Sequence, residues 1–407
     1  MANLLYLVHR LPYPPNKGDK VRSYHVLKHL LAGHRVFLGT FVDDPQDLAH
    51  LDTVRRWCAG FHATQLSPRR ARVASLAGLA TGEALTLRYY RDEALAAWVR
   101  QTLATERIDA AVVFSSSMVQ YAEGVPGLPM LVDFVDVDSA KWGEYAGRHL
   151  WPLSWLYRRE GQRLLAYERR AASRAERSFF VTSKEAALFR QLAPECGSRV
   201  DALCNGVDAD YFAPDANLSS PFSADEWPLV FTGAMDYWPN IDAAVWFTQE
   251  VLPALRREWP RLRFHIVGRA PTPAVRALAG EAVNVTGTVP DVRPYLQHAR
   301  VVVAPLRLAR GVQNKVLEAM AMGRPVVAAQ SCVEAIDAMP GRDLIGADEA
   351  GDYQRHISAL LRDPQQAGSL GEAGRACVVR HYSWAAHLGS LDGHLDAAIA
   401  ARAGVAA

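Results

Sequence analysis

Short apolar runs alternate with helical patterns along the first half of the chain. The runs lie at residues 3–8, 35–41, 110–114, 130–134 and 178–182. A loop rich in proline and glycine follows the first run, and a helical pattern comes after it and ends at Gly33. Because such alternation is typical of βαβ units, the pattern predicts an α/β fold with a parallel, doubly wound sheet.

The alternation stops near residue 205 and starts again after a polar segment. This segment, at about 206–226, is rich in turn-forming residues, and we interpret it as a linker. Further apolar runs lie at 229–232, 264–267, 283–286, 301–304 and 326–329. The sequence therefore predicts two α/β domains, 1–205 and 206–383, and a C-terminal helix at 384–407 that packs back on the first domain. In such domains, a ligand site is expected at the carboxyl ends of the strands.

Composition narrows the classes of protein that fit this pattern. Half of the residues are hydrophobic, and 45 Lys and Arg stand against 43 Asp and Glu, which leaves a net charge of only +2. This balance argues against nucleic-acid binding, which usually needs a marked basic excess. No apolar run reaches the roughly 18–20 residues that span a bilayer, and the N-terminus reads as a strand rather than a signal peptide. The five cysteines form no CxxC pair, so we expect a cytoplasmic protein without a metal site.

The segment 301–329 carries the most informative chemistry. It contains a helical pattern in which Asn314 is the expected N-cap and Gly323 the expected end. Lys315 would lie in the first turn, where the helix dipole disfavours a cation. The position is explained if Lys315 and the positive end of the helix together hold an anion such as a diphosphate. Glu318 would lie on the same face and accept hydrogen bonds from a ribose diol. The alternative is a surface helix in which Lys315 is solvated and Glu318 forms a local ion pair.

The run from Gly311 to Ala328 resembles the donor-site helix of retaining glycosyltransferases of family 4, which have the GT-B fold of two facing Rossmann-like domains. Other segments fit this family in the right order. They are Pro12–Gly18, Gly33–Val36, Val181–Glu185, Asn205–Asp208, Phe231–Gly233, Ile266–Gly268, Val285–Val289 and Tyr382–Trp384. The resemblance covers nearly the whole chain and is closest to the branch associated with bacterial exopolysaccharide and exosortase-type gene systems.

The resemblance implies transfer of a sugar from a nucleotide-diphosphate donor to a hydroxyl, with retained anomeric configuration and without a metal or another cofactor. The acceptor would be a glycan or a lipid-linked intermediate. Glu318 would hold the ribose, Lys315 and the amides at the start of its helix the diphosphate, and the backbone at 288–289 the nucleobase. The implied donor-binding residues are Gly18, Gly233, Thr288, Val289, Arg310, Gly311, Val312, Asn314, Lys315 and Glu318.

Two donor-side features depart from the family pattern. The first of the two motif glutamates is replaced by Arg310. One hypothesis is that Arg310 pairs with a carboxylate on a uronic-type sugar, and the alternative is an exposed loop arginine. The usual Arg and Lys after the glycine of Phe231–Gly233 are also missing, which leaves Lys315 a larger share of the diphosphate charge. In this region, we expect Asn240 to cap the following helix.

The usual catalytic-region histidine of the first domain is also not evident. The corresponding strand end carries Asp133, Asp136 and Asp138. Asp136 and Asp138 would share one face if the strand continued, and buried like charges would raise a pKa, as an acid/base site needs. The alternative is that Asp138 caps the next helix. His9, at the end of the first strand, is well placed for a cleft. The catalytic candidates are therefore Lys315, Asp136 and His9.

Seven arginines accompany Trp151, Trp155 and other apolar residues between 151 and 177. A basic helix with aromatic residues can lie on an anionic membrane, so transient contact at the inner face of the cytoplasmic membrane is one interpretation. The other is an ordinary surface helix, in which Glu160, Glu168 and Glu176 compensate the arginines locally. Two functional alternatives also stay open: a GT-B sugar-nucleotide epimerase, and a catalytically silent subunit that binds sugar nucleotides.

Overall fold

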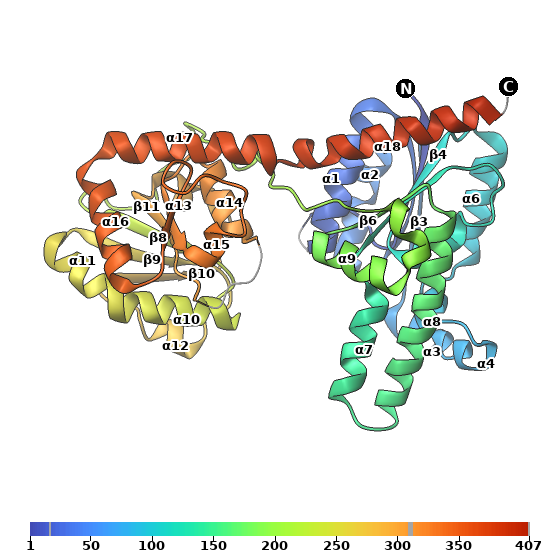
Figure 1. Ribbon diagram of the computed structural model, residues 1–407, viewed down its shortest axis with the longest axis horizontal. Coiled ribbons are helices and arrows are strands. Elements are labelled where there is room, and N and C mark those ends of the chain that lie inside the picture. Colours follow the sequence, from blue (N-terminus) through green and yellow to red (C-terminus); the bar gives the residue numbers. More distant parts are fainter. Residues whose placement is uncertain (16–17, 308–311, 406–407) are drawn as a thin grey trace. The chain divides into compact units, whose positions relative to one another are not determined.

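A computed structural model describes residues 1–15, 18–307 and 312–405 (Figure 1). Contacts between Cα atoms divide the chain into two compact domains. The first contains Met1–Asn205 together with His387–Ala407, and the second contains Gly206–Ala386. In the described part of the chain, no helix combines the length and the apolar character that crossing a bilayer requires.

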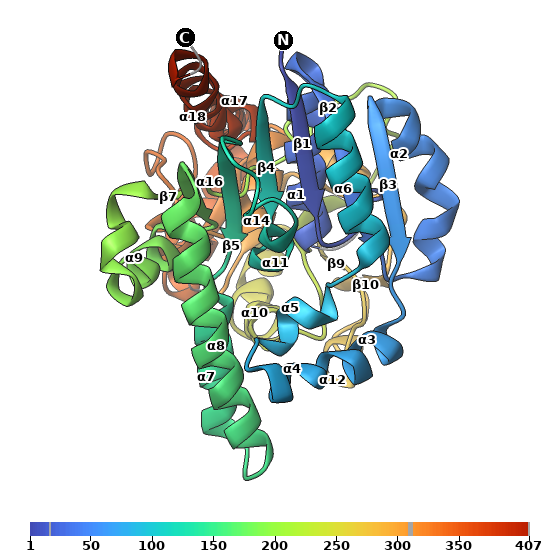
Figure 2. The ribbon, with the colours of Figure 1, turned by 90° about the vertical axis from the view of Figure 1, so that its right-hand side faces the viewer.

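The first domain is built on seven parallel strands. They are β1 (Asn3–Val8), β2 (Arg35–Val42), β3 (Gly60–Gln65), β4 (Ala110–Phe114), β5 (Met130–Val135), β6 (Arg177–Phe180) and β7 (Val200–Ala202). Their order across the sheet is β3-β2-β1-β4-β5-β6-β7, which Figure 2 shows from the side of this domain. The central strands are continuous apolar runs because helices cover both faces of a parallel sheet. Leu5 and Leu7 of β1 and Val132 of β5 are fully buried there.

Helices connect these strands. They are α1 (Gly18–Gly33), α2 (Leu51–Trp57), α3 (Pro68–Ser75), α4 (Ala77–Thr81), α5 (Leu85–Tyr89), α6 (Glu93–Thr105), α7 (Asp138–Arg148), α8 (Leu153–Arg174) and α9 (Ser183–Leu192). Short 3₁₀ turns lie at Pro45–His50, Ser116–Tyr121 and Pro194–Arg199. Helices α7 and α8 form a long hairpin that projects from the body of the domain (Figure 1).

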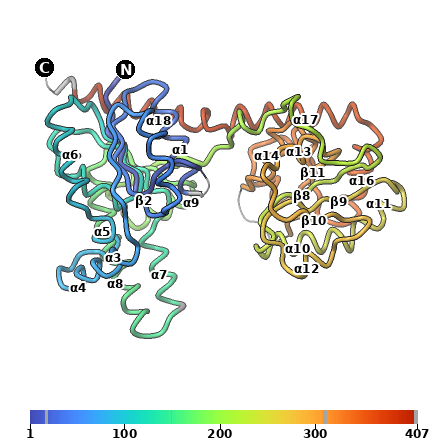
Figure 3. The backbone as a smooth tube through the Cα atoms, turned by 180° about the vertical axis from the view of Figure 1, so that it is seen from behind, coloured from blue at the N-terminus to red at the C-terminus, as the bar shows by residue number. Residues whose placement is uncertain are grey.

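The last helix, α18 (Trp384–Val405), packs on the first domain beside α1 (Figure 3). The imidazole Nε2 of His29 lies 2.8 Å from a carboxylate oxygen of Asp392. The guanidinium of Arg402 donates hydrogen bonds to the carbonyl oxygens of Ile108, at 2.5 Å, and Asp109, at 3.1 Å. These polar contacts fix the middle and the C-terminal end of the helix against the domain from which the chain started.

The second domain has six parallel strands. They are β8 (Trp227–Thr232), β9 (Leu262–Val267), β10 (Val283–Gly287), β11 (Val301–Ala304), β12 (Val326–Ala329) and β13 (Ile345–Ala347), and their order is β10-β9-β8-β11-β12-β13. Its helices are α10 (Trp238–Trp246), α11 (Leu252–Glu258), α12 (Pro273–Arg276), α13 (Arg293–His298), α14 (Asn314–Ala321), α15 (Gln330–Val333), α16 (Ala350–Arg362) and α17 (Pro364–His381). A π turn at Phe247–Val251 joins α10 to α11.

The start of the linker is fixed against the end of the second domain. Val207 pairs with Ser383 in an isolated parallel bridge, and its amide donates to the carbonyl of Tyr382 at 2.7 Å. A Cβ at Gly206 would lie 2.5 Å from the amide nitrogen of Trp384, so this approach requires glycine. The Asn-Gly-Val-Asp motif therefore has a packing function at the point where α17 gives way to α18.

Candidate functional site

Strands β8 and β9 end in two glycines whose backbones touch. Gly233 has a φ of 155° and Gly268 a φ of 152°. A Cβ at Gly268 would lie only 1.7 Å from the carbonyl oxygen of Gly233, so no other residue fits without backbone movement. The amide of Gly268 in turn donates to the carbonyl of Gly287, at 3.2 Å, at the end of β10. The carboxyl ends of three neighbouring strands are thereby held in close register.

Lys315 points towards this glycine contact. Its ammonium group donates a hydrogen bond to the side-chain oxygen of Asn240 and lies 4.9 Å from the ring centre of Phe231 in β8. A Cβ at Gly233 would lie 3.0 Å from the Lys315 nitrogen. Burial lowers the pKa of Lys315 to about 8, although Cys332 and Glu318 favour the charged form. The side chain is therefore largely desolvated, which contradicts the alternative of a solvated surface lysine.

Two predicted helix caps are not formed. Helix α14 begins at Asn314, and Gln313 occupies the cap position in its place. Helix α10 begins at Trp238, so Asn240 lies inside its first turn. Asn240 is buried, and its amide group donates to the carbonyl of Ala234 at 2.8 Å while its oxygen accepts from Lys315. The amide thus connects the loop after β8 to Lys315, which sequence reasoning missed because the two residues are distant in the chain.

Glu318 lies one helical turn after Lys315. Burial raises the pKa of its carboxyl to about 7, and the charge of Lys315 counteracts part of that rise. Among the described residues, no ion pair within 4 Å joins Glu318 to Lys315. Both residues are largely buried but keep some exposed surface, and both lie near the start of one helix. An anionic group with a neighbouring diol matches this pair.

The remaining donor-side candidates lie in several places. Thr288 helps to line a pocket of about 660 Å³ at the ends of β9 and β10, whose walls also contain Arg269 and Arg276. Val289 packs against the core of the second domain, whereas Val312 and Asn314 are exposed. These two arginines supply positive charge at the strand ends, and sequence reasoning overlooked them because they belong to no recognised motif.

The structure does not test three further candidates for the donor site. Arg310 and Gly311 lie outside the described residues. Gly18 is the first residue of α1, so it belongs to the first domain. The second domain therefore brings together Lys315, Glu318 and the end of β8 at Gly233, and the first domain has a site of its own.

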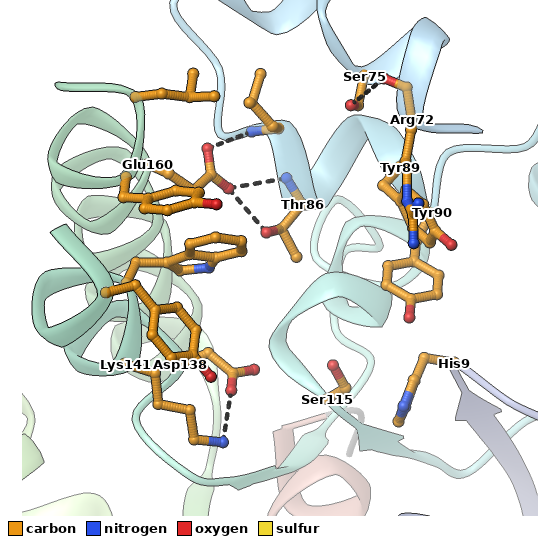
Figure 4. A pocket seen from close by; sticks show the side chains of 15 residues that line it. His9, Arg72, Ser75, Thr86, Tyr89, Tyr90, Ser115, Asp138, Lys141 and Glu160 are labelled. Atoms are coloured by element: carbon orange, nitrogen blue, oxygen red, sulfur yellow. Dashed lines mark hydrogen bonds and ion pairs between the residues drawn. The ribbon is translucent and has the colours of Figure 1, made fainter. Parts of the chain in front are cut away.

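That first-domain site is a pocket of about 520 Å³ at the carboxyl ends of β1 and β4 (Figure 4). His9 lies at its base, where the imidazole stacks on Phe114 with 5.7 Å between ring centres. The imidazole Nε2 lies 3.4 Å from a carboxylate oxygen of Asp19. Burial alone would raise the pKa of Asp19, but the hydrogen bond with His9 and the charge of Arg10 bring it well below its usual range. The other walls are aromatic and polar: Tyr89, Tyr90, Trp142, Tyr145, Tyr157, Ser115, Asp138 and Lys141.

The two aspartates after β5 do not form a like-charge pair. The strand ends at Val135, whose φ of 69° turns the chain. The ammonium group of Lys141 lies 2.7 Å from a carboxylate oxygen of Asp136 and 3.1 Å from one of Asp138. Burial would lower the pKa of Lys141, but these two carboxylates raise it to about 12. The predicted mutual repulsion is therefore cancelled by a shared cation.

Asp138 does not cap helix α7 either. Val137 occupies the cap position, and its amide donates to the carboxylate of Glu185 at 2.7 Å. The backbone amide and the hydroxyl of Ser139 both donate to the carboxyl group of Glu168, at 3.3 and 2.5 Å. The side chains of two acidic residues, one from α9 and one from α8, thus accept hydrogen bonds from amides at the start of α7 that have no partner within the helix.

Comparison with known proteins gives one family match. Residues 228–363 match the family model described as glycosyl transferases group 1. Among curated protein sequences, none matches the chain significantly. In the described residues, no group of three or more His, Cys, Asp or Glu side chains is placed to hold a metal ion.

Solved structures match nearly the whole chain. Sucrose-phosphate synthase from Thermosynechococcus elongatus is 17% identical with a TM-score of 0.60, and the match covers 98% of this chain and 100% of that one. HepE from Anabaena, in a complex with UDP, is 15% identical with a TM-score of 0.61 over 98% and 100% of the two chains. A glycosyltransferase from Rickettsia africae is 14% identical with a TM-score of 0.63 over 98% of each. At this identity the likeness concerns the fold, and it confirms the predicted GT-B class with two Rossmann-like domains.

Proposed function

We propose that the protein transfers a sugar from a nucleotide-diphosphate donor to a hydroxyl acceptor, with retained anomeric configuration. The observation that carries the proposal is the position of Lys315. It is a desolvated cation at the start of α14, aimed at the glycine-lined end of β8, with Glu318 one turn away. The family match of residues 228–363 and the UDP bound to HepE support a nucleotide sugar as the donor.

In this proposal the second domain binds the donor. The diphosphate lies against Lys315 and the first amides of α14, where the helix dipole adds positive potential. Glu318 accepts hydrogen bonds from the ribose hydroxyls, and the backbone at Thr288 and Val289 meets the base. These groups are fixed before the reaction, so they stabilise the negative charge that develops on the leaving diphosphate without a metal ion.

The acceptor is proposed to enter the aromatic pocket of the first domain. Tyrosine and tryptophan rings offer apolar faces to a sugar or lipid moiety, and polar groups at the base orient its hydroxyl. Transfer breaks the bond between the anomeric carbon and the phosphate oxygen and forms a bond from the same face of the sugar to the acceptor oxygen. The acceptor proton goes to the departing phosphate, so His9 would position the acceptor rather than act as a strong base. Asp136 does not line the pocket and would act only through Lys141, which does.

The experiment is a turnover assay over a panel of nucleotide sugars, with and without glycan and lipid-linked acceptors and with a chelator present. The proposal expects nucleoside diphosphate release that increases with acceptor, survives the chelator, and yields a product of unchanged anomeric configuration. Replacing Lys315 with Ala should lower turnover about 100-fold, the scale of losing one preorganised charge donor. A loss below tenfold would tell against the role of Lys315.

Other outcomes of the same assay would identify a different function. Conversion of the donor sugar without an acceptor would indicate an epimerase. Binding of nucleotide sugars without any release of diphosphate would indicate a silent subunit.

The identity of the donor sugar is a separate proposal. If Arg310 recognises a carboxylate, the wild type should prefer uronic-type donors and Arg310→Glu should lose that preference. Equal turnover of neutral hexose donors by both proteins would rule out this role.

A further inference from the structure

Two insertions leave the same edge of the first-domain sheet. Helices α3, α4 and α5 follow the end of β3, and the α7–α8 hairpin follows the end of β5. The strands are parallel, so both insertions emerge at the carboxyl edge, where the aromatic pocket also lies. Figures 1 and 2 show both at one end of the domain, with the hairpin extending beyond α3 and α4.

The tip of the hairpin exposes large apolar side chains. Leu150 is 89% and Trp151 is 81% exposed, and Leu153 and Trp155 are about half exposed. The hairpin is held together further down, where Trp142 and Tyr157 pack with 5.3 Å between ring centres. The tip residues are therefore not needed for the packing of the hairpin itself. Four neighbouring apolar side chains at a projecting tip are typical of a surface that contacts a partner or a membrane.

Helices α3 and α4 also expose apolar side chains, together with arginines. Val73, Leu76 and Leu79 are exposed and follow each other at intervals of three residues, which places them along one side of the segment. Arg69, Arg70 and Arg72 are exposed in the same segment, and residues 67–82 contain no acidic residue. Exposed arginines and exposed apolar side chains on one short segment are a combination that an anionic membrane surface attracts.

The hairpin and the α3–α4 segment are locked to each other. The guanidinium of Arg159 in α8 donates to the carbonyl oxygens of Gly78 and Glu83, at 2.6 and 3.1 Å. The buried carboxylate of Glu160 accepts from the amides of Leu85 and Thr86, at 2.7 and 2.9 Å (Figure 4). The expected role of Glu160 in compensating surface arginines is therefore wrong, as it is for the equally buried Glu168.

Little acidic charge offsets the basic side chains of this region. Residues 145–159 contain three arginines and no acidic residue. Glu83, the nearest acidic residue after α4, is engaged by Arg88 at 2.6 Å and by Arg91 at 2.9 Å. Glu144 of α7 is an exposed carboxylate next to this region, but basic and apolar groups outnumber it, and this combination matches the negative headgroups and acyl boundary of a bilayer better than it matches a typical protein surface.

We propose that the hairpin tip and the α3–α4 segment together form a docking surface for an anionic phospholipid bilayer. Trp151 and Trp155 would enter the headgroup region, where tryptophan is favoured, while Arg69 and Arg70 would meet lipid phosphates. The aromatic pocket lies between the two insertions, because it is lined by Ser75 of α3 as well as Tyr157 of α8. An amphipathic acceptor in the bilayer could therefore present its polar head to the pocket. The docking itself does not depend on the sugar-transfer proposal.

The test is co-flotation of the full chain with vesicles of phosphatidylglycerol and phosphatidylcholine, and with vesicles of phosphatidylcholine alone. We expect binding to the first at low salt, weak binding to the second, and loss of binding as salt screens the charges. Replacing both Arg69 and Arg70 with Ser should weaken binding about tenfold or more, since each arginine near an anionic surface contributes roughly a factor of five. Replacing both Trp151 and Trp155 with Ser should weaken it at least as much.

Matched controls separate this surface from net charge and from folding. Arg55→Ser with Arg107→Ser removes the same two charges from exposed positions away from this edge, and it should leave vesicle binding unchanged. Met339→Ser with Val379→Ser removes exposed apolar groups from the second domain. No binding of the wild type at low salt, or equal loss in variants and controls, would overturn the proposal. If the protein binds vesicles but shows no transferase activity, the docking proposal stands. The missing activity then refutes the sugar-transfer proposal.

Discussion

The ammonium group of Lys315 donates a hydrogen bond to the side-chain oxygen of Asn240, although the two residues are 75 positions apart. Asn240 is neutral, so it orients Lys315 without cancelling its charge. A cation in the first turn of a helix is otherwise disfavoured by the dipole. The pair therefore keeps a positive group at the strand ends, where an anion can bind to it.

Replacing Asn240 with Asp should weaken nucleoside diphosphate binding more than replacing it with Ala. A carboxylate beside Lys315 neutralises the cation and repels the diphosphate, whereas alanine only removes the orienting acceptor. We expect affinity for UDP, measured by calorimetry, to fall about 10- to 100-fold for Asn240→Asp and less than tenfold for Asn240→Ala. Asn217→Asp, which adds the same charge to an exposed loop, serves as control. Wild-type affinity in Asn240→Asp would contradict the arrangement.

The affinity for a nucleoside diphosphate should depend on pH with two limbs. Lys315 holds an anion only when it is protonated, so affinity should fall as pH rises through its pKa of about 8. Glu318 accepts diol hydrogen bonds best when it is ionised, so affinity should rise through its pKa of about 7. Calorimetric titration of UDP across this range measures both limbs.

Two conservative variants assign these limbs. Lys315→Arg stays charged at every pH of the titration, so it should lose the alkaline limb. Glu318→Gln should lose the acidic limb. If the affinity of Lys315→Arg for UDP falls in parallel with that of the wild type as pH rises through about 8, the alkaline limb does not belong to Lys315.

Replacing Gly233 with Ala should disturb the site while the domain stays folded. The new Cβ would lie 2.7 Å from the side-chain Nδ2 of Asn240 and 3.0 Å from Nζ of Lys315, and the φ of 155° is strained for alanine. We expect UDP affinity to fall about tenfold or more, as one charge-assisted contact is displaced. Gly280→Ala, where the added carbon meets open space, is the matched control in the same domain. Equal affinity in both variants would show that the contact is not needed for binding.

The central strands could be predicted from sequence because burial on both faces leaves an uninterrupted apolar run. The expected runs 3–8, 110–114, 301–304 and 326–329 have the same bounds as β1, β4, β11 and β12. The edge strand β3 was missed because its residues, such as His62 and Thr64, are only partly buried and mix polar with apolar character. The three-residue strands β7 and β13 are too short to show a pattern.

The candidate site was predictable only where its chemistry is local. The position of Lys315 in the first turn of a helix follows from residues that are adjacent in the chain. Its contact with Asn240 and the contact of Glu168 with the start of α7 join segments that are distant in the chain. The cation shared by Asp136 and Asp138 belongs to Lys141, only three to five residues further on, and sequence reasoning overlooked it. Local reasoning predicted helix caps for Asn240 and Asp138 and a repulsion between Asp136 and Asp138. When the partner of a polar side chain is not known, the nearest backbone group is the partner that the sequence suggests.

Glu168 should make the first domain less stable at alkaline pH. Burial raises the pKa of its carboxyl to about 8, although the hydrogen bonds from Ser139 oppose that rise. The folded state therefore keeps a proton that the unfolded chain releases near the ordinary glutamate pKa of 4.5. The favourable contribution is complete below the unfolded pKa and is lost as pH rises through the folded one, with a slope approaching about 1.4 kcal/mol per pH unit. Glu168→Gln mimics the protonated form and should remove this dependence.

The measurement is the free energy of unfolding of the wild type and Glu168→Gln from about one pH unit above the unfolded pKa to one above the folded pKa. The free energy of unfolding of Glu168→Gln minus that of the wild type should increase by about 3 kcal/mol from the lower to the higher pH. Because a chain of two domains need not unfold in one step, hydrogen exchange of the α7 amides should report the same trend locally. Glu144→Gln, at an exposed position of the same helix, should show no such shift. A difference that stays constant with pH would mean that Glu168 is ionised in the folded protein and caps α7 as a carboxylate.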